Sequence, residues 1–177
     1  MKFFQMFSVF AGAAISFVIS SSQILANNSQ DDQEFYLRFL ETGELADDAI
    51  EDIECLAHNI YHEARGEEEI GQIAVAYVTM NRVEHWYFPD SVCDVVWEPG
   101  QFSWTRDGRS DAMYDEERAE FALDVAVRVY YQIENDPVQG ALFYHATYIN
   151  APSWTRQMNL VDRIGIHKFY TWDGEWN

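Results

Sequence analysis

A carboxyl group near the end of one predicted helix has the placement of a general acid. Apolar residues recur at helical spacing from Ile53 to Ala64, and Gly66 follows where such a helix would end. Taking 100° per residue, Glu63 lies about 80° from the centre of the apolar stripe, on the shoulder of the buried face. Partial burial raises the pKa of a carboxyl group, which a general acid working near neutral pH requires. A surface glutamate paired with Arg65 would produce the same pattern, so geometry alone leaves both interpretations open.

Two histidines on the same helix offer a different chemistry. His58 and His62 are four residues apart, a spacing that invites comparison with zinc peptidases and amidases. The zinc motif, however, places a glutamate directly after the first histidine, where this sequence has Asn59. The helical wheel also points His62 into solvent, about 180° from the apolar stripe. We therefore expect no metal and no cofactor. A zinc-dependent amidase, which would lose its activity in a chelator, is the alternative.

The elements that position these residues are predicted to be helices first and strands last. Apolar residues at helical spacing predict three helices, over about 53–66, 69–83 and 116–134. Asp115 is the expected N-cap of the third helix. Residues rich in β-branched and aromatic side chains predict two short strands, over 141–149 and 163–172. Residues 85–113 carry prolines, glycines and tryptophans and are expected to be irregular. This order predicts an α+β fold.

The composition indicates a single acidic domain that is rich in aromatic residues. The chain has 177 residues, which suits one compact domain. Its 30 acidic and 11 basic residues give a net charge of −19, which argues against nucleic acid or an anionic lipid surface as the main partner. Aromatic residues make up 16% of the chain, and this content is compatible both with stacking on sugars and with a core of large rings.

The N-terminus has the pattern of a secretory signal peptide. Residues 1–26 begin with a single positive charge at Lys2, continue through a mostly apolar stretch and finish with the small residue Ala26. The apolar run is short for a membrane-spanning helix, and an uncleaved anchor is the alternative. We expect export to the periplasm, the cell wall or the exterior, with no membrane contact in the mature form. Residues 27–53 would then form an acidic, loosely ordered leader, and residues 54–177 the catalytic domain.

Export changes how the two cysteines are interpreted. In an oxidising compartment an even number of cysteines favours a disulfide, here between Cys55 and Cys93. Two separate buried thiols are the alternative. The chain has no CxxC motif, and two cysteines alone cannot build a zinc site.

A set of short segments occurs in order along residues 54–170. The segments are Ile60–Glu67, Gly71–Ala76, Asn81–Val83, Phe88-Pro89, Val92–Val96, Gln101–Trp104, Ala141–Ala146 and Ile164–Phe169. In this order and spacing the chain resembles the SleB-like cell-wall hydrolases, the family named for spore-cortex-lytic enzymes. The chain departs from the family at Ile166, where relatives often have asparagine. It also has Gly100 and Arg106 near the places where many exported relatives carry a second cysteine pair.

The resemblance implies a fold and an activity. The fold would be a lysozyme-like helical domain with a small antiparallel β element toward the C-terminus. The substrate would be peptidoglycan, cut at the MurNAc–GlcNAc glycosidic bond, with Glu63 in the position of the family's catalytic glutamate. The resemblance suggests a lytic transglycosylase route, and a muramidase that uses water is the nearest alternative. A non-catalytic wall-binding module would keep an aromatic cleft without needing an acid. We expect peptidoglycan as the partner, and a monomer.

Seven further residues are candidates for substrate contact. They are Gln101, Ser103, Trp104, Tyr144, His145, Trp154 and His167. The first three lie in the irregular segment, where packing of the loop is the alternative role. For His167 a purely structural role is the alternative. Asn81, on an apolar helix stripe, is expected to be a buried hydrogen-bonding residue and not a catalyst.

Overall fold

The computed structural model describes residues 38–39, 41–44, 46 and 49–174. Its longer helices are α2 (Ile50–Ala64), α3 (Glu69–Val83), α4 (Val92–Trp97) and α5 (Glu116–Tyr130). Two short 3₁₀ helices are η1 (Trp104–Arg106) and η2 (Ser153–Gln157). The strands are β1 (Phe143–Ala146), β2 (Asn159–Ile164) and β3 (His167–Thr171). The predicted signal peptide lies outside the described residues.

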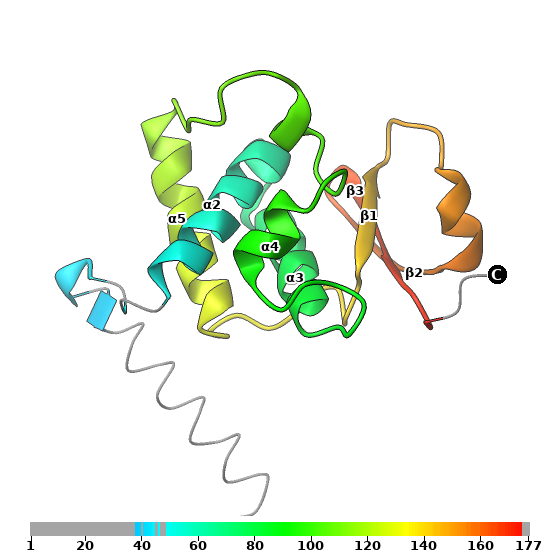
Figure 1. The fold of residues 1–177 in the computed structure, drawn as a ribbon, viewed down its shortest axis with the longest axis horizontal. Coiled ribbons are helices and arrows are strands. Elements are labelled where there is room, and N and C mark those ends of the chain that lie inside the picture. Colours follow the sequence, from blue (N-terminus) through cyan, green and yellow to red (C-terminus); the bar gives the residue numbers. More distant parts are fainter. Residues whose placement is uncertain (1–37, 40, 45, 47–48, 175–177) are drawn as a thin grey trace, which may run out of the picture.

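The helices form one half of the molecule and the strands the other, as Figure 1 shows. The three strands make an antiparallel sheet in the order β1-β3-β2, so β3 is central. This arrangement confirms the α+β fold with a small antiparallel element toward the C-terminus. None of the helices in the described residues combines the length and apolar content needed to cross a lipid bilayer.

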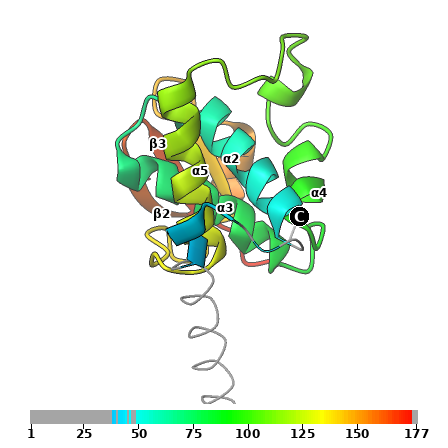
Figure 2. The same cartoon turned by 90° about the vertical axis from the view of Figure 1, so that its left-hand side faces the viewer.

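Helix α2 lies at the centre of the helical half. It contacts α3, α4 and α5, and the views in Figures 1 and 2 place it among them. Its apolar stripe is fully buried, with Ile53, Leu56 and Ile60 each at 0% exposure. Burial of such side chains is the main driving force for folding. The helix that carries Glu63 is therefore held rigidly by three neighbours.

Two local predictions are wrong. The region expected to be irregular contains α4, which begins where the Ser91 hydroxyl accepts a hydrogen bond from the Asp94 backbone N–H at 3.1 Å. The strand expected over 163–172 is two strands, β2 and β3, because the chain reverses at Gly165 with a φ of 56°. The six residues of α4 are too few to show a clear helical period in the sequence. A continuous run of β-branched and aromatic residues gives no sign of the hairpin turn inside it.

The folded domain begins earlier than expected. Helix α2 starts at Ile50, so the boundary drawn between residues 53 and 54 falls inside its first turn. Ala49 is buried at 3% exposure, and Phe39 and Ala46 pack against the core. Part of the acidic leader therefore contributes apolar contacts to the domain.

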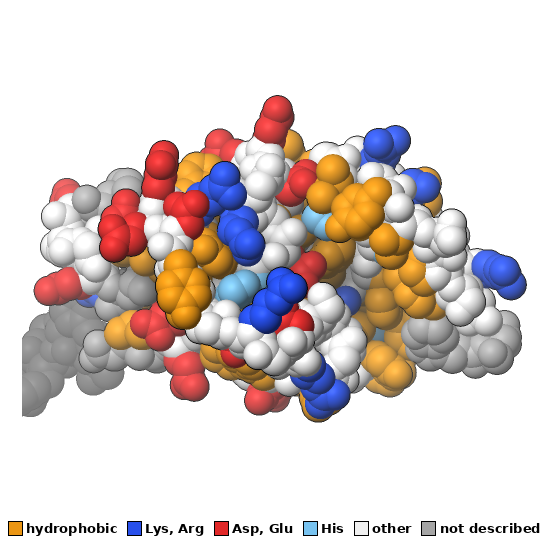
Figure 3. Space-filling view, turned by 90° about the horizontal axis from the view of Figure 1, so that it is seen from above, with side chains coloured by type: hydrophobic (Ala, Val, Ile, Leu, Met, Phe, Trp, Pro, Cys, Tyr) orange, Lys and Arg blue, Asp and Glu red, His pale blue; other side chains and the backbone are white. Residues whose placement is uncertain are grey.

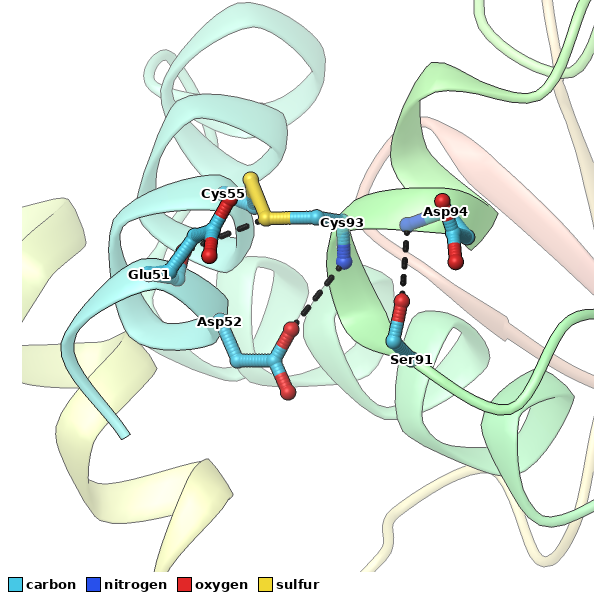
Figure 4. The surroundings of a disulfide bond; sticks show 6 residues. All are labelled: Glu51, Asp52, Cys55, Ser91, Cys93 and Asp94. Atoms are coloured by element: carbon cyan, nitrogen blue, oxygen red, sulfur yellow. Dashed lines mark hydrogen bonds between the residues drawn. A yellow bond between two sulfur atoms is a disulfide. The ribbon is translucent and has the colours of Figure 1, made fainter. Parts of the chain in front are cut away.

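The predicted disulfide joins α2 to α4 (Figure 4). Cys55 and Cys93 are bonded, with their Cα atoms 5.2 Å apart. Next to the bond, the Asp52 carboxylate accepts a hydrogen bond from the Cys93 backbone N–H at 3.2 Å. The cross-link and this hydrogen bond hold α4 against the first turns of α2.

We predict that reduction of the Cys55–Cys93 bond destabilises the domain. The bond closes a separation of 38 residues, and in the chain-entropy model such a loop stabilises the fold by about 4 kcal/mol. Denaturant unfolding with and without reductant measures the loss. The Cys55→Ala/Cys93→Ala variant is the control, because reductant should leave its stability unchanged. Equal stability of the oxidised and reduced wild-type chain would contradict the prediction.

Candidate active site

The predicted site residues come from distant parts of the chain and line one cavity. This cavity has a volume of about 510 Å³ and lies between the helices and the sheet. Its lining includes Glu63 and all seven candidate contact residues, Gln101, Ser103, Trp104, Tyr144, His145, Trp154 and His167. We call it the cleft. The structure thus brings together every residue that the sequence analysis selected for catalysis or substrate contact.

Glu63 projects from the last turn of α2 and is partly buried at the cleft. Burial raises the pKa of its carboxyl group. The Tyr144 hydroxyl and the positive charge of Arg82 act in the opposite direction and lower this pKa. The Tyr144 hydroxyl is itself buried beside Glu63. These opposing influences make Glu63 a carboxyl group that can hold a proton and can also release it.

Arg82 is a charged cleft residue that the sequence analysis missed. It lies in α3, is only 4% exposed, and its Nε donates a hydrogen bond to the Leu142 backbone carbonyl at 2.8 Å. Its guanidinium lies over the rings of three phenylalanines, within 5.2–5.5 Å of the centroids of Phe88, Phe102 and Phe143. Among the described residues Arg82 forms no ion pair, and its Nη1 has no hydrogen-bond partner.

The charge of Arg82 therefore acts from a buried position at the edge of the cleft. Burial lowers the pKa of its guanidinium, and the nearby groups Tyr144, Glu98 and Glu63 raise it. A buried cation near a carboxyl group stabilises the carboxylate that remains after proton donation. The motif Asn81-Arg82-Val83 was a signal for this residue. No sequence pattern, however, shows that α3 turns Arg82 toward the cleft.

The expectation that His62 points into solvent is wrong. Its ring stacks on Trp104 with centroids 4.5 Å apart, and its Nε2 is hydrogen-bonded to the Asp111 backbone carbonyl at 3.0 Å. The segment after α4 folds over the outer face of α2 and covers the histidine. Trp104 in turn donates from Nε1 to the Asn59 side-chain oxygen at 3.2 Å. Asn59, the residue that breaks the zinc motif, therefore positions a cleft aromatic ring.

The histidine pair on α2 is not part of a metal-binding cluster in the described part of the chain. The rings of His58 and His62 are stacked with centroids 6.2 Å apart. Burial, followed by the neighbouring His62, lowers the pKa of His58. Over residues 49–174 and the other described positions, no three histidine, cysteine, aspartate or glutamate side chains come together as a metal site.

The sheet contributes the opposite wall of the cleft. His145 in β1 is hydrogen-bonded through Nε2 to the Tyr170 hydroxyl at 3.0 Å, and its ring stacks on that tyrosine. The rings of Trp154 and His145 pack edge to face, with their centroids 5.9 Å apart. The rings of His167 and Tyr144 also pack edge to face, with their centroids 5.0 Å apart. Burial lowers the pKa of His167. The two histidines are held in aromatic clusters, and His145 has its ring nitrogens already engaged.

Asn81 is a hydrogen-bonding residue as predicted, although it is half-buried and not buried. Its side-chain amide donates to the Asp136 carboxylate and to the Ala141 backbone carbonyl, both at 3.2 Å. These bonds tie α3 to the segment that leads into β1. Asn81 is not among the residues that line the cleft.

A carboxylate four residues after Glu63 holds the β2–β3 turn in place. The Glu67 Oε2 accepts a hydrogen bond from the Ile166 backbone N–H at 3.1 Å. The Ile166 carbonyl accepts another from the Thr147 backbone N–H at 2.6 Å. A Cβ atom on Gly165 would overlap the Glu67 carboxylate, so only glycine allows this approach. The turn that places Ile166 and His167 at the cleft is thus fixed from two sides.

We predict that Gly165→Ala destabilises the domain more than Gly108→Ala does. Both glycines have positive φ, 56° and 74°, so alanine is strained at both positions, at a cost of about 1–2 kcal/mol. Only at Gly165 does the added methyl group also meet Glu67, whereas at Gly108 it meets open space. Denaturant unfolding of both variants measures the difference. In a Glu67→Ala background the excess loss at Gly165 should shrink, and an unchanged excess would contradict the Glu67 contact.

Comparison with known proteins identifies the family. Residues 66–170 match the family model described as Cell Wall Hydrolase. The spore cortex-lytic enzymes of Bacillus subtilis (strain 168) and Halalkalibacterium halodurans are each 36% identical to the chain over 118 residues. These matches cover 67% of this chain but only 37% and 34% of the two relatives. The chain therefore matches little more than a third of the length of each.

Two solved structures resemble the domain more completely. They are the catalytic domain of the Bacillus cereus SleB protein and the catalytic domain of the germination-specific lytic transglycosylase SleB from Bacillus anthracis. Each has a TM-score of 0.56 and 32% sequence identity, and each match covers 68% of this chain. The matches cover 89% and 93% of those two chains. The fold is the lysozyme-like one that the sequence motifs implied, and the chain belongs to the SleB-like family of cell wall hydrolases.

Proposed function

We propose that the chain cleaves the glycan strands of peptidoglycan and that Glu63 is its single general acid and base. The observation that carries this proposal is the placement of Glu63. It is a partly buried carboxyl group with a raised pKa, in a cleft that also holds every candidate contact residue. Membership of the cell wall hydrolase family supports the same substrate. Export, as the N-terminus predicts, would bring the chain to this substrate.

The cleft favours a mechanism with one carboxyl group. Of the side chains that line it in the described residues, Glu63 is the only aspartate or glutamate. Ordinary glycosidases use two carboxyl groups, one for the leaving oxygen and one for the nucleophile or its activation. A lytic transglycosylase needs only one, because the nucleophile is the C6 hydroxyl of the sugar itself. One of the two similar solved structures is described as a lytic transglycosylase.

In this route Glu63 first donates a proton and then receives one back. The Glu63 carboxyl group donates its proton to the glycosidic oxygen as the bond from that oxygen to the anomeric carbon breaks. The C6 oxygen forms a new bond to the anomeric carbon, and its proton passes to the Glu63 carboxylate. The product is an anhydro sugar, and Glu63 is again protonated. Attack within one sugar ring gives the hydroxyl a high effective concentration.

The other cleft residues support the two states of Glu63 and the position of the sugar. Arg82 and Tyr144 favour the carboxylate in the middle of the reaction, since both lower the pKa of Glu63. Trp154 and Trp104 supply apolar ring surface for sugar rings. Gln101 and Ser103 supply hydrogen-bonding groups at the cleft wall.

We predict that Glu63→Gln abolishes glycan cleavage while the fold survives. Glutamine keeps the size of the side chain but cannot deliver a proton. The cleavage rate should therefore fall by about 10²–10⁴-fold or more. The test is digestion of purified peptidoglycan with products identified by mass spectrometry. Glu54→Gln, on the exposed face of the same helix, is the control and should retain activity.

The products also separate the alternatives. Anhydro-muramyl ends support the transglycosylase route, whereas reducing ends indicate hydrolysis by water with the same acid. Freed stem peptides, together with loss of activity in chelator, would overturn the proposal in favour of a zinc amidase. Unimpaired cleavage by Glu63→Gln would show that Glu63 is not the acid.

We predict that Glu63 makes the stability of the chain depend on pH. Because burial raises its pKa, the folded chain holds this proton more tightly than the unfolded chain. The stabilisation is complete below the unfolded pKa and is lost as the pH rises through the folded pKa. The unfolding free energy of the wild type, measured relative to Glu63→Gln, should therefore fall as the pH rises above about 4.3, the ordinary pKa of a glutamate. Parallel pH profiles of the two proteins would contradict a raised pKa.

A further inference from the structure

A second carboxyl group lies near Arg82 but outside the cleft. It belongs to Glu98, the residue at which α4 ends, and Glu98 is not among the cleft-lining residues. A tight turn follows, in which the Glu98 carbonyl accepts a hydrogen bond from the Gln101 backbone N–H at 3.2 Å. The next residue, Phe102, has its ring centroid 5.3 Å from the Arg82 guanidinium. This turn therefore brings the segment that carries Glu98 to the buried cation.

Glu98 and Arg82 each have a buried polar atom without a hydrogen bond. The Glu98 Oε2 and the Arg82 Nη1 are both shielded from solvent and have no hydrogen-bond partner. Neither residue takes part in an ion pair among the described residues. A buried cation and a buried anion attract each other strongly even without direct contact, because little water screens them. Glu98 is accordingly one of the groups that raise the pKa of the Arg82 guanidinium against the effect of burial.

We infer that Glu98 is a positioning residue, which shares the Arg82 cation with Glu63 and thereby helps Glu63 to keep its proton. The inference rests on the proposed function, in which Glu63 must begin each reaction in its protonated form. An arginine that acted on Glu63 alone would favour the carboxylate and would leave less of the acid form. With a second anion beside it, the same cation acts on Glu63 more weakly. Glu98 therefore moderates Arg82 without touching the substrate.

The charged and titratable groups around Arg82 come from three other parts of the fold. Tyr144 lies in β1, Glu98 follows α4, and Glu63 lies at the end of α2. Arg82 and Tyr144 are in turn the groups that act on Glu63. The remaining titratable side chains that line the cleft are His62, His145, Tyr148 and His167. Of the groups that act on Arg82 in the described part of the chain, Glu98 is the carboxylate outside the cleft, so it competes with Glu63 for the cation.

The burial of Arg82 makes a single neighbouring charge effective. Figure 3 shows lysine and arginine side chains on the molecular surface, several of them near the middle of the face seen from above. Water and salt screen charges that are exposed in this way, so each affects its neighbours only weakly. Arg82 is only 4% exposed. Removal of one carboxylate beside it should therefore change the electrostatic field at Glu63 measurably.

The pH dependence of cleavage by Glu98→Gln tests the inference. Glutamine keeps the shape of the side chain and removes its charge, so the variant should hold the Glu63 proton less tightly. We expect the alkaline side of the pH profile of peptidoglycan cleavage to move to lower pH. Cleavage there should be about threefold to tenfold slower than in the wild type, with an unchanged rate at acidic pH. Glu98→Ala should give the same shift, and Glu98→Asp, which keeps the charge, should restore the wild-type profile.

Asp94→Asn is the matched control. Asp94 lies in α4, is exposed, and is not among the groups that act on Arg82 or Glu63. Removal of its charge should leave the pH profile unchanged. Circular dichroism of each variant checks that the fold is retained.

A titration of Glu63 itself separates this inference from the proposed function. With carbon-13 in the glutamate carboxyl groups, the signal that Glu63→Gln removes belongs to Glu63, and its midpoint should lie at lower pH in Glu98→Gln than in the wild type. An unchanged midpoint, a loss of cleavage that is equal at every pH, or a Glu98→Asp profile like that of Glu98→Gln overturns the inference. Failure of the wild-type chain to cleave peptidoglycan would reject the proposed function, and the carboxyl titration would still decide whether Glu98 acts on Glu63.

Discussion

The partial burial of one carboxyl group at the end of α2 is the constraint on which the rest of the site depends. Full exposure would leave Glu63 ionised near neutral pH, and full burial without a counter-charge would leave it unable to release its proton. The structure avoids both extremes. Helix α2 is held by three other helices, so its last turn brings Glu63 to a partly buried position at the cleft. Arg82 and Tyr144 then offset part of the effect of burial on its pKa.

Arg82 both lowers the pKa of Glu63 and connects α3 to the segment before β1. A buried guanidinium without an ion pair is costly, and its placement needs other partners. These partners are the Leu142 carbonyl, which accepts a hydrogen bond from Arg82, and the rings of Phe88, Phe102 and Phe143, which lie against the guanidinium. The cation that favours the Glu63 carboxylate therefore also joins the helical half to the residue just before β1.

The two halves of the molecule are aligned by a small number of polar contacts to the backbone. Arg82 bonds the Leu142 carbonyl, Asn81 bonds the Ala141 carbonyl, and Glu67 bonds the Ile166 N–H. Each of these contacts joins a side chain of the helical half to the backbone at or near a strand end. Hydrogen bonds are directional, so these three bonds restrict how the helical half and the strand ends are oriented relative to each other.

Local patterns in the sequence determined the elements that depend on near neighbours. The helical period over α2, α3 and α5 predicted those helices. Asp115 predicted the start of α5, where its carboxylate accepts the Arg118 N–H at 3.2 Å. The even cysteine count predicted the disulfide, and the shoulder position of Glu63 together with its motif predicted the candidate acid.

Only the tertiary structure decided the burial of Arg82, the stacking of His62 on Trp104 and the hydrogen bond from the Ile166 backbone N–H to Glu67, 99 residues away. Periodicity and capping report energies between residues a few positions apart. Burial and long-range hydrogen bonds depend on which surfaces the folded chain brings together, and no local pattern records that.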